Sequence, residues 1–491
     1  MCLDKLCARV ARGTSIARWW RLPRHREPPL IVPSGVSSVP FRAGPLRLTI
    51  LAMIGVLIVT ASVVFVLLFL DVPKGWSPAP GFAPLIGDVY QRALSFPHHE
   101  LTPDQYTYAS MGTLLAAWTL WGAGLWLLAR TKEPVERDRA LLIVAVVAVT
   151  GRALLVLLPP VTSADLYRYA LFGKMIAFHH LNPLVTPANV LTGDPMLTYT
   201  SWPSQSSLYG PTFLWIAAMV ARLCGDQLIA TGVAFKAVSA AADLAVCWAL
   251  YRLARRTGSD DGLGALALYA WSPLALVESA VGAHVESLMM ALALGGLLLA
   301  ERKRVEGAFA LFLMSAAVKY VSAIVGVLYF VHAVAAEPDA RRRLACGVRL
   351  LATAAVVLAA LYAPFWEGPD MLSLAVEHLA GGRNLAPSGD PVRSAPAVVI
   401  AGVALLAGAS LVVVARGRLE RVAEMSAAVI LAYLLFVFQY KFAWYFLSPL
   451  ALTAAGARTP TNRVLLMLSV TWGLLLMFTY AVLFNVAHPG M

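Results

Sequence analysis

Apolar stretches of helical length, separated by short basic segments, dominate this sequence and limit what the chain can fold into. Such stretches, of about 15 to 25 residues each, recur from residue 47 to the C-terminus, and about 20 helical residues cross the hydrocarbon core of a bilayer. Charged residues make up only 13% of the 491, about half their share in a soluble protein. The sequence therefore predicts an all-α polytopic membrane protein and excludes a soluble globular fold.

The basic residues indicate how the chain is oriented. The net charge is +12, from 39 Lys and Arg against 27 Asp and Glu. Most of these cations lie between apolar stretches, as in cytoplasmic loops, so we expect membrane lipids and no nucleic acid as partners. Residues 1–46 are basic and rich in proline. We expect them to form a disordered cytoplasmic arm before a retained helix, not a cleaved signal peptide, and residues 47–491 to form one transmembrane domain.

Placing the basic segments on the cytoplasmic side of the cell (inner) membrane predicts about thirteen crossings, with the N-terminus inside and the C-terminus outside. The expected spans are 47–70, 108–129, 140–158, 227–251, 262–281, 285–301, 307–319, 321–337, 345–365, 394–415, 423–440, 442–457 and 463–485. Residues 159–226 then form a long outer loop. Polar and aromatic residues collect in this loop, and we expect the chemistry there.

Two segments need a special arrangement to keep the later basic clusters inside. If 209–224 crossed the membrane, the arginines after residue 251 would face outward, so we expect an interfacial or re-entrant helix there. Segment 307–337 is long enough for one span, but arginines 341–343 stay inside only if it forms a hairpin. We therefore expect two short spans broken near Lys319, with this lysine in a hollow at the outer side.

Ionisable residues cluster at two places on the expected outer side. Asp165 and Arg168 lie three residues apart on a predicted helix and share a face; a local ion pair is the alternative to a catalytic role. Glu278, His284 and Glu286 lie near the tip of the hairpin formed by 262–281 and 285–301. Such groups are costly in a membrane unless they face water or a partner, and a solvated turn is the simplest alternative.

Two lysines stand among apolar and aromatic residues near the same side. Lys319 can snorkel to the interface or meet a buried anion. Lys441 lies beside Tyr440, Trp444 and Tyr445, which form an aromatic belt in the structural interpretation.

Arg152, Lys236 and Asp243 are charged residues well inside the expected spans. A transporter uses such charges near the midplane, but a structural pair is the simpler interpretation. The five cysteines are scattered, with neither a metal-ligand spacing nor a disulfide framework. The acidic residues on the expected outer side form no D-x-D pair either, so we expect no metal and no cofactor.

Several short motifs together resemble a known family. They are P-P-x-x-S-x-D-L-Y-R-Y-x-x-x-G from Pro159 to Gly173, Asn182-Pro183, Tyr209-Gly210-Pro211, and G-x-H-V-E-S-L-M from Gly282 to Met289. The set is similar to that of bacterial polyprenol-phosphomannose-dependent mannosyltransferases of the GT-C superfamily, over roughly residues 140–340. Val285-Glu286 replaces the usual Asn-Asp, and Leu184 stands where an aromatic residue is common.

The resemblance implies an inverting transfer of one sugar, mannose by motif similarity, from a polyprenyl phosphate to a glycan or glycolipid acceptor at the outer face. Asp165 is then the general base that accepts the proton of the attacking hydroxyl. Lys319 would stabilise the leaving phosphate, with Arg168 and Lys441 as further candidates. The residues expected to bind the sugar or acceptor are Tyr167, Tyr209, His284, Glu286, Asn182 and Trp444.

Two functions of other classes stay open at this point. A transporter or flippase for a lipid-linked sugar would use the charges within the spans, although the chain shows no inverted repeat. A scaffold without catalysis would not need acidic and basic side chains gathered outside. Within the enzyme class, arabinose, glucose and aminoarabinose donors are alternatives to mannose.

Overall fold

The computed structural model describes residues 44–68, 102–160, 162–200, 202–256, 262–368, 395–437, 441–456 and 458–486. Within these ranges all regular structure is helical, which agrees with the expected fold class. The arm expected over 1–46 lies, except for its last three residues, outside the described part of the chain.

Six helices are long and apolar enough to cross a membrane. They are α2 (Gly44–Leu68), α4 (Pro103–Arg130), α5 (Pro134–Leu157), α8 (Leu228–Arg256), α14 (Ala340–Tyr362) and α19 (Pro460–Val486). A bent pair, α9 (Leu263–Ala270) with α10 (Pro273–Ala280), makes a seventh if it is one span. By length and composition the described residues thus supply six or seven crossings, and the expected total of about thirteen stays a prediction.

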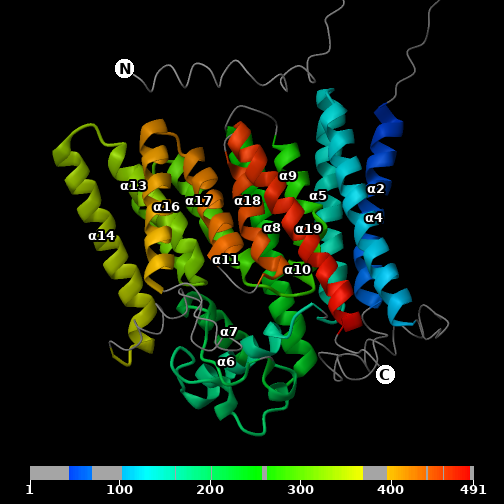
Figure 1. Ribbon diagram of the computed structural model, residues 1–491, viewed down its shortest axis with the longest axis horizontal. Helices are drawn as coiled ribbons and strands as arrows, with labels where there is room; N and C mark the ends of the chain where they lie inside the picture. The colour runs from blue at the N-terminus through cyan, green and yellow to red at the C-terminus, as the bar shows by residue number, and fades with distance from the viewer. Residues whose placement is uncertain are drawn as a thin grey trace, which may run out of the picture. The chain divides into compact units, whose positions relative to one another are not determined.

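Shorter helices pack beside the long ones. They are α11 (Glu286–Glu301), α12 (Val305–Ala316), α13 (Ala323–Ala335), α16 (Ala395–Arg416), α17 (Glu420–Ala432) and α18 (Leu447–Ala455). α11 packs against both α8 and α12, and α17 packs against α18. In Figure 1 these helices run roughly alongside α5 and α8.

Two breaks in the helices matter for the site. α12 ends at Ala316, and the backbone of Lys319 is extended before a 3-10 turn, η5 (Tyr320–Ser322), leads into α13. The break predicted near Lys319 is confirmed. The segment expected to span over 262–281 is helical but not straight, because the chain bends by 57° between α9 and α10. Pro273 begins α10 and has no N–H to continue α9.

Two helices of the loop 159–226 form a separate layer at one end of the bundle. α6 (Asp165–His179) and α7 (Pro211–Cys224) pack along each other, and Figure 1 shows them at one end of the bundle, where they also contact α8. Gly173 permits this contact, since a Cβ there would lie 2.2 Å from the backbone oxygen of Ala217. The opposite face of α7 exposes Trp215, Met219 and Leu223. This apolar stripe is typical of an interfacial helix.

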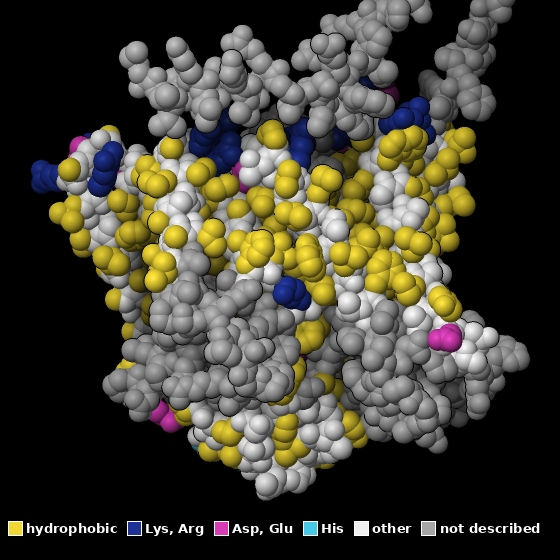
Figure 2. Space-filling model, in the orientation of Figure 1, with side chains coloured by type: hydrophobic (Ala, Val, Ile, Leu, Met, Phe, Trp, Pro, Cys, Tyr) yellow, Lys and Arg dark blue, Asp and Glu magenta, His cyan; other side chains and the backbone are white. Residues whose placement is uncertain are grey.

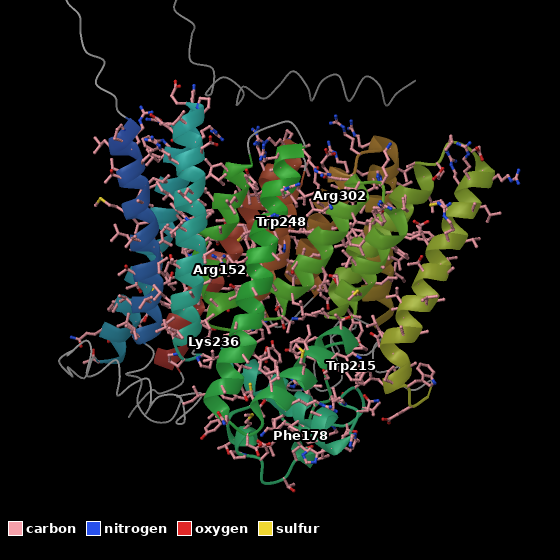
Figure 3. All side chains as sticks on the ribbon, turned by 180° about the vertical axis from the view of Figure 1, so that it is seen from behind. Arg152, Phe178, Trp215, Lys236, Trp248 and Arg302 are labelled. Carbon is pink, nitrogen blue, oxygen red and sulfur yellow. The ribbon has the colours of Figure 1, made fainter. Side chains whose placement is uncertain are left out.

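Basic side chains gather at the other end of the helices. Figure 2 shows Lys and Arg along the edge of the visible face that lies opposite α6 and α7. Figure 3 places Arg302, between α11 and α12, at that end, while Phe178 of α6 and Trp215 of α7 lie at the far end. The basic segments and the loop 159–226 are therefore separated by the length of the bundle.

The charges within the long helices include a structural pair, as the simpler interpretation predicted. Nε of Arg152 lies 2.6 Å from Oδ2 of Asp243, and both side chains are buried. Nη1 of Arg152 also donates to the carbonyl oxygens of Ala148 and Ala270, and Tyr269 donates to the other oxygen of Asp243 at 2.7 Å. The pair therefore fixes α5 and α8 to the bend between α9 and α10.

Candidate functional site

Asp165 begins α6 and faces a cluster of polar and aromatic side chains. Its carboxylate accepts a hydrogen bond of 3.2 Å from the hydroxyl of Tyr209, and Nδ1 of His284 lies 3.9 Å from Oδ2. Burial raises the pKa of Asp165 above its usual range, although the charges of Arg168 and Lys319 and the bond from Tyr209 act in the opposite direction. A raised pKa gives a stronger base.

The motif Tyr209-Gly210-Pro211 brings Tyr209 beside the break at Lys319. The N–H of Gly210 donates to the carbonyl oxygen of Val318 at 3.1 Å, and that of Thr212 donates to Ala317 at 3.0 Å. A Cβ on Gly210 would lie 2.4 Å from the oxygen of Ala317, so only glycine permits this approach of two backbones.

Lys319 also lies near Tyr209, and its side chain is partly buried. Its ammonium forms an ion pair with Glu286 and lies 4.3 Å from the ring centre of Tyr445 and 6.0 Å from that of Tyr209. The snorkelling alternative is not what the structure shows. Asp165 and Lys319, which come from distant segments, both contact Tyr209, so the predicted base and the predicted phosphate ligand lie in one cluster.

The tip of the hairpin between α10 and α11 folds inward. His284 is 0% exposed, and Glu278 and Glu286 are buried as well, so the alternative of a solvated turn is wrong. The imidazole stacks on the ring of Trp444, with centroids 4.0 Å apart and an interplanar angle of 14°, and its Nε2 lies 3.3 Å from Glu278. A Cβ on Gly282 would come within 2.8 Å of Nε2, so glycine is needed for this packing.

A cavity of about 90 Å³ lies directly beside Lys319 and Glu286. Most of its lining is apolar or aromatic. The lining residues are Leu208, Glu286, Lys319, Tyr320, Val321, Ile430, Tyr433, Leu434, Tyr445 and Ser448. Such a site has the composition of a small-molecule pocket, with few polar groups among apolar ones.

The two further phosphate candidates differ in their surroundings. Arg168 is buried and donates Nη2 to the carbonyl oxygens of Ser206 at 2.9 Å and Gln205 at 3.4 Å, while its Nε has no hydrogen-bond partner among the described residues. The structure shows no ion pair between Arg168 and Asp165 within the described ranges. Lys441 makes no ion pair in that part of the chain, and its neighbour Tyr440 lies outside the described residues.

Asn182, Tyr167 and Trp444, which were predicted to bind sugar or acceptor, make different contacts in the structure. Nδ2 of Asn182 donates to the carbonyl oxygen of Phe365 at 2.7 Å, and its Oδ1 accepts from the N–H of Leu184 at 3.0 Å. Asn182 thus ties the loop 159–226 to the end of α14. Tyr167 is buried, with its ring 5.5 Å from that of Tyr199. Trp444 reaches the cluster through His284. For all of them, sugar binding stays a prediction.

One face of α8 supports the site, and sequence reasoning missed this. Lys236 donates to the carbonyl oxygen of Leu158, where the loop 159–226 begins, and Ser239 donates to that of His284 at 3.0 Å. Asp243 accepts from Ser287 at 3.3 Å. The three α8 residues lie three and four positions apart and so share a face. Figure 3 shows Lys236 between the level of Arg152 and the layer of α6 and α7.

Glu278 and Tyr445 were also missed as site residues. Both were visible in the sequence, Glu278 as part of the hairpin cluster and Tyr445 as part of an aromatic run, but nothing there showed which groups they contact. Among the described residues, no three His, Cys, Asp or Glu side chains lie together as metal ligands would.

The fold and the cluster define a helical membrane protein in which a carboxylate, a lysine and several aromatic rings meet at one end of the bundle, beside an apolar cavity. Comparison with known families gives a more specific result. The family described as "Alpha-(1->6)-mannopyranosyltransferase, N-terminal domain" matches residues 59–337, more than half of the chain. The chain belongs to this alpha-(1->6)-mannopyranosyltransferase family.

Curated relatives carry the same description. Alpha-(1->6)-mannopyranosyltransferase A of Corynebacterium glutamicum is 33% identical over 35% of this chain and 34% of its own length. A probable alpha-(1->6)-mannopyranosyltransferase of Mycolicibacterium smegmatis is 34% identical over 29% of this chain and 26% of its own. Alpha-(1->6)-mannopyranosyltransferase A of Mycobacterium tuberculosis is 28% identical over 49% and 45%. The matched part of the chain thus spans between a quarter and a half of each relative.

Proposed function

We propose that this protein is an integral membrane mannosyltransferase that moves one mannose from a polyprenyl phosphate to a hydroxyl of a glycan or glycolipid. The observation that carries the proposal is the contact of both Asp165 and Lys319 with Tyr209, beside a largely apolar cavity. Family membership supports mannose as the sugar. The apolar lining supports a lipid-linked donor.

The geometry suits a single displacement. Asp165 accepts the proton of the acceptor hydroxyl while its oxygen attacks the anomeric carbon. The bond from that carbon to the phosphate oxygen breaks, and its electron pair leaves on the phosphate. Lys319 stabilises the growing negative charge. Because the nucleophile enters opposite the leaving group, the configuration inverts.

The surroundings of Lys319 also suit the proposal. Its ammonium pairs with Glu286 and lies over Tyr445, so it is held at the edge of the cavity. A donor phosphate there would gain a charge-assisted contact. Apolar side chains such as Ile430 and Leu434 would contact the lipid, with about 0.8 kcal/mol for each methylene removed from water.

We further infer that the basic end of the bundle is cytoplasmic and that α6 and α7 lie at the outer face. Cytoplasmic loops are enriched in Lys and Arg, and Figure 2 shows such side chains gathered opposite α6 and α7. With this orientation, the shorter helices α11, α12, α13, α16, α17 and α18 would supply the remaining six of about thirteen crossings as short spans, with α12 and α13 as the hairpin broken at Lys319. Nucleotide sugars are cytoplasmic, so an outer site supports a lipid phosphate as donor.

The variant Asp165→Asn tests the proposal. Purified full-length protein in detergent is given radiolabelled polyprenyl-phosphate mannose and a glycolipid acceptor, and product is counted. Loss of a general base slows transfer by about 100-fold or more. Asp226→Asn is the matched control, because Asp226 is a 92% exposed carboxylate of the same outer loop; it should transfer at the normal rate. Near-normal turnover by Asp165→Asn would exclude Asp165 as the base.

A flippase would move the donor across the bilayer without turnover, and the same assay separates the two functions. The buried Arg152–Asp243 pair, which a transporter would use, is fully engaged in fixing helices. No observation in the described part of the chain favours that alternative.

A further inference from the structure

Three titratable side chains form a line that leads inward from the site. Asp165 is at the outer end, with its side chain 14% exposed, and His284 and Glu278 follow at 0%. Nδ1 of His284 lies 3.9 Å from Asp165, and Nε2 lies 3.3 Å from Glu278. The imidazole therefore stands between two carboxyl groups, one at the reaction centre and one in the interior.

The imidazole is held from several sides. Its ring stacks on Trp444, and Gly282 packs against its edge. Its backbone N–H donates to the carbonyl oxygen of Glu278 at 3.2 Å, while its carbonyl oxygen accepts from Ser239. His284 does not line the cavity, which Glu286 and Lys319 do. A fully buried ring fixed in this way faces Asp165 on one side and Glu278 on the other.

The charge state of this imidazole decides what it does to Asp165. Burial, and then the positive charge of Lys319, lower the pKa of His284 well below its usual range, so the ring is neutral and carries one N–H. Neither ring nitrogen of His284 has a hydrogen-bond partner among the described residues. A proton on Nε2 can donate to Oε2 of Glu278 after a small reorientation over the 3.3 Å between them, and the lone pair of Nδ1 then faces Asp165. A lone pair there favours the protonated form of Asp165, which can donate to it.

We propose that Glu278 and His284 are positioning residues that set the basicity of Asp165, with Glu278 fixing the imidazole tautomer whose lone pair receives the protonated Asp165. The inference rests on the proposed function and deepens it. The proton balance is closed. The acceptor O–H bond breaks, and its proton passes to Asp165, which donates it in a hydrogen bond to Nδ1. The released electron pair forms the bond to the anomeric carbon, while the bond from that carbon to the phosphate oxygen breaks and its electron pair leaves on the phosphate. The distance of 3.9 Å shortens as the proton arrives, since catalytic hydrogen bonds are often long before substrate binds.

Other groups also face Asp165, and the test leaves them unchanged. Arg168, Lys319 and the Tyr209 hydroxyl favour the carboxylate form. The negative charges of Glu286 and Asp165 repel each other. The hydroxyl of Tyr169, which lies on α6 together with Asp165, also senses the charge of Asp165. A change made only at Glu278 or His284 isolates the imidazole.

The variant Glu278→Gln provides the first measurement. The glutamine amide donates to Nε2, so the imidazole proton moves to Nδ1 and donates to the Asp165 carboxylate, which lowers the pKa of Asp165. We expect the acid limb of the kcat/KM-versus-pH profile to move down by about one pH unit. The plateau rate should fall by about tenfold, because the base is weaker. Glu301→Gln, at the far end of α11, is the matched control and should leave the limb in place.

The variant His284→Phe gives an independent measurement, because it keeps a ring stacked on Trp444 and removes the lone pair. We expect the acid limb to move in the same direction. Adding Glu278→Gln to His284→Phe should cause no further shift, since the proposed effect of Glu278 on Asp165 passes through the imidazole. If Glu278→Gln accumulates poorly in the membrane, the limb of His284→Phe decides alone.

Each outcome supports or overturns the inference. An acid limb that stays in place in His284→Phe, or shifts that add in the double variant, would overturn it. Failure of the proposed function is distinguishable, because it would appear as full activity in Asp165→Asn. An essential Asp165 with an unmoved limb would contradict only the role of Glu278 and His284.

Discussion

Two glycines, which carry no reactive side chain, allow the close backbone contacts that position Asp165 and Lys319. Gly210 lets the segment after Tyr209 bond to the backbone just before Lys319. Gly173 lets α6, which carries Asp165, lie against α7. Both belong to the motifs that resemble the mannosyltransferase family, so part of that resemblance reports close backbone contacts and not substrate contacts.

At the scale of one residue, Gly210→Ala tests this placement. The added methyl group would meet the oxygen of Ala317 at 2.4 Å, and the two backbones must separate. We expect the free energy of unfolding to fall by about 1–3 kcal/mol, and transfer to fall by more than tenfold because Lys319 moves from Tyr209. Thermal unfolding in detergent and the transfer assay measure these effects.

The matched control is Gly122→Ala, in the middle of α4, where nothing lies within 4 Å of the new Cβ. It should keep wild-type transfer. Equal activity of Gly210→Ala and Gly122→Ala would show that the contact with Ala317 does not place Lys319.

At the scale of elements, α8 holds the segments that carry the site. Lys236 binds the end of α5, Ser239 binds the turn at His284, and Asp243 binds both Arg152 and the first turn of α11 through Ser287. The chain bends between α9 and α10 and is broken at Lys319. The segment between these two points contacts this face of α8 through His284 and Ser287. One helix thus sets the relative position of the loop 159–226 and the hairpin.

The variant Asp243→Asn tests the support from α8. It removes the partner of a buried guanidinium, and we expect the free energy of unfolding to fall by about 3–5 kcal/mol. Replacing both Arg152 and Asp243 by leucine should restore much of it, because no charge is then left unpaired. Ser239→Ala, which loses one neutral hydrogen bond, should cost only about 1 kcal/mol. An Asp243→Asn protein as stable as wild type would show that the Arg152–Asp243 pair does not stabilise the fold.

The sequence indicated where the helices lie along the chain, but much less about which side chains contact one another. Hydropathy and basic clusters predicted the helices and the break at Lys319, and the motifs predicted that Asp165 and Lys319 act together. They did not predict that Glu278 and His284 turn inward or that Asn182 bonds to Phe365. Hydropathy reports how apolar a segment is, but which polar group meets a buried histidine depends on contacts between segments far apart in the chain. Nothing in the sequence around Ser239 indicates that its hydroxyl donates to the backbone of His284.

At the scale of the whole molecule, the basic segments and the layer of α6 and α7 lie at opposite ends of the bundle (Figures 2 and 3). A lipid-phosphate donor must present its headgroup at one membrane surface. The chain places a cluster of acids, lysine and aromatic rings at the end opposite the basic segments, and this separation is the basis for the proposed site at the outer face.

Cysteine labelling tests this orientation. In a background without the natural cysteines, Asp226→Cys marks the turn between α7 and α8, and Arg302→Cys marks the turn between α11 and α12. A membrane-impermeant maleimide added to intact cells should label Asp226→Cys and should label Arg302→Cys only after the membrane is permeabilised. The reverse pattern would place the site in the cytoplasm.

The central claim is that Lys319 holds the donor phosphate while Asp165 faces the anomeric carbon from the opposite side. A cryo-electron microscopy structure of Asp165→Asn with polyprenyl-phosphate mannose bound tests it most directly. We predict a phosphate oxygen about 3 Å from Nζ of Lys319, the prenyl chain against Ile430 and Leu434, and residue 165 across the sugar from the phosphate. A phosphate bound at Lys441 or at the basic end, with residue 165 away from the sugar, would contradict the account.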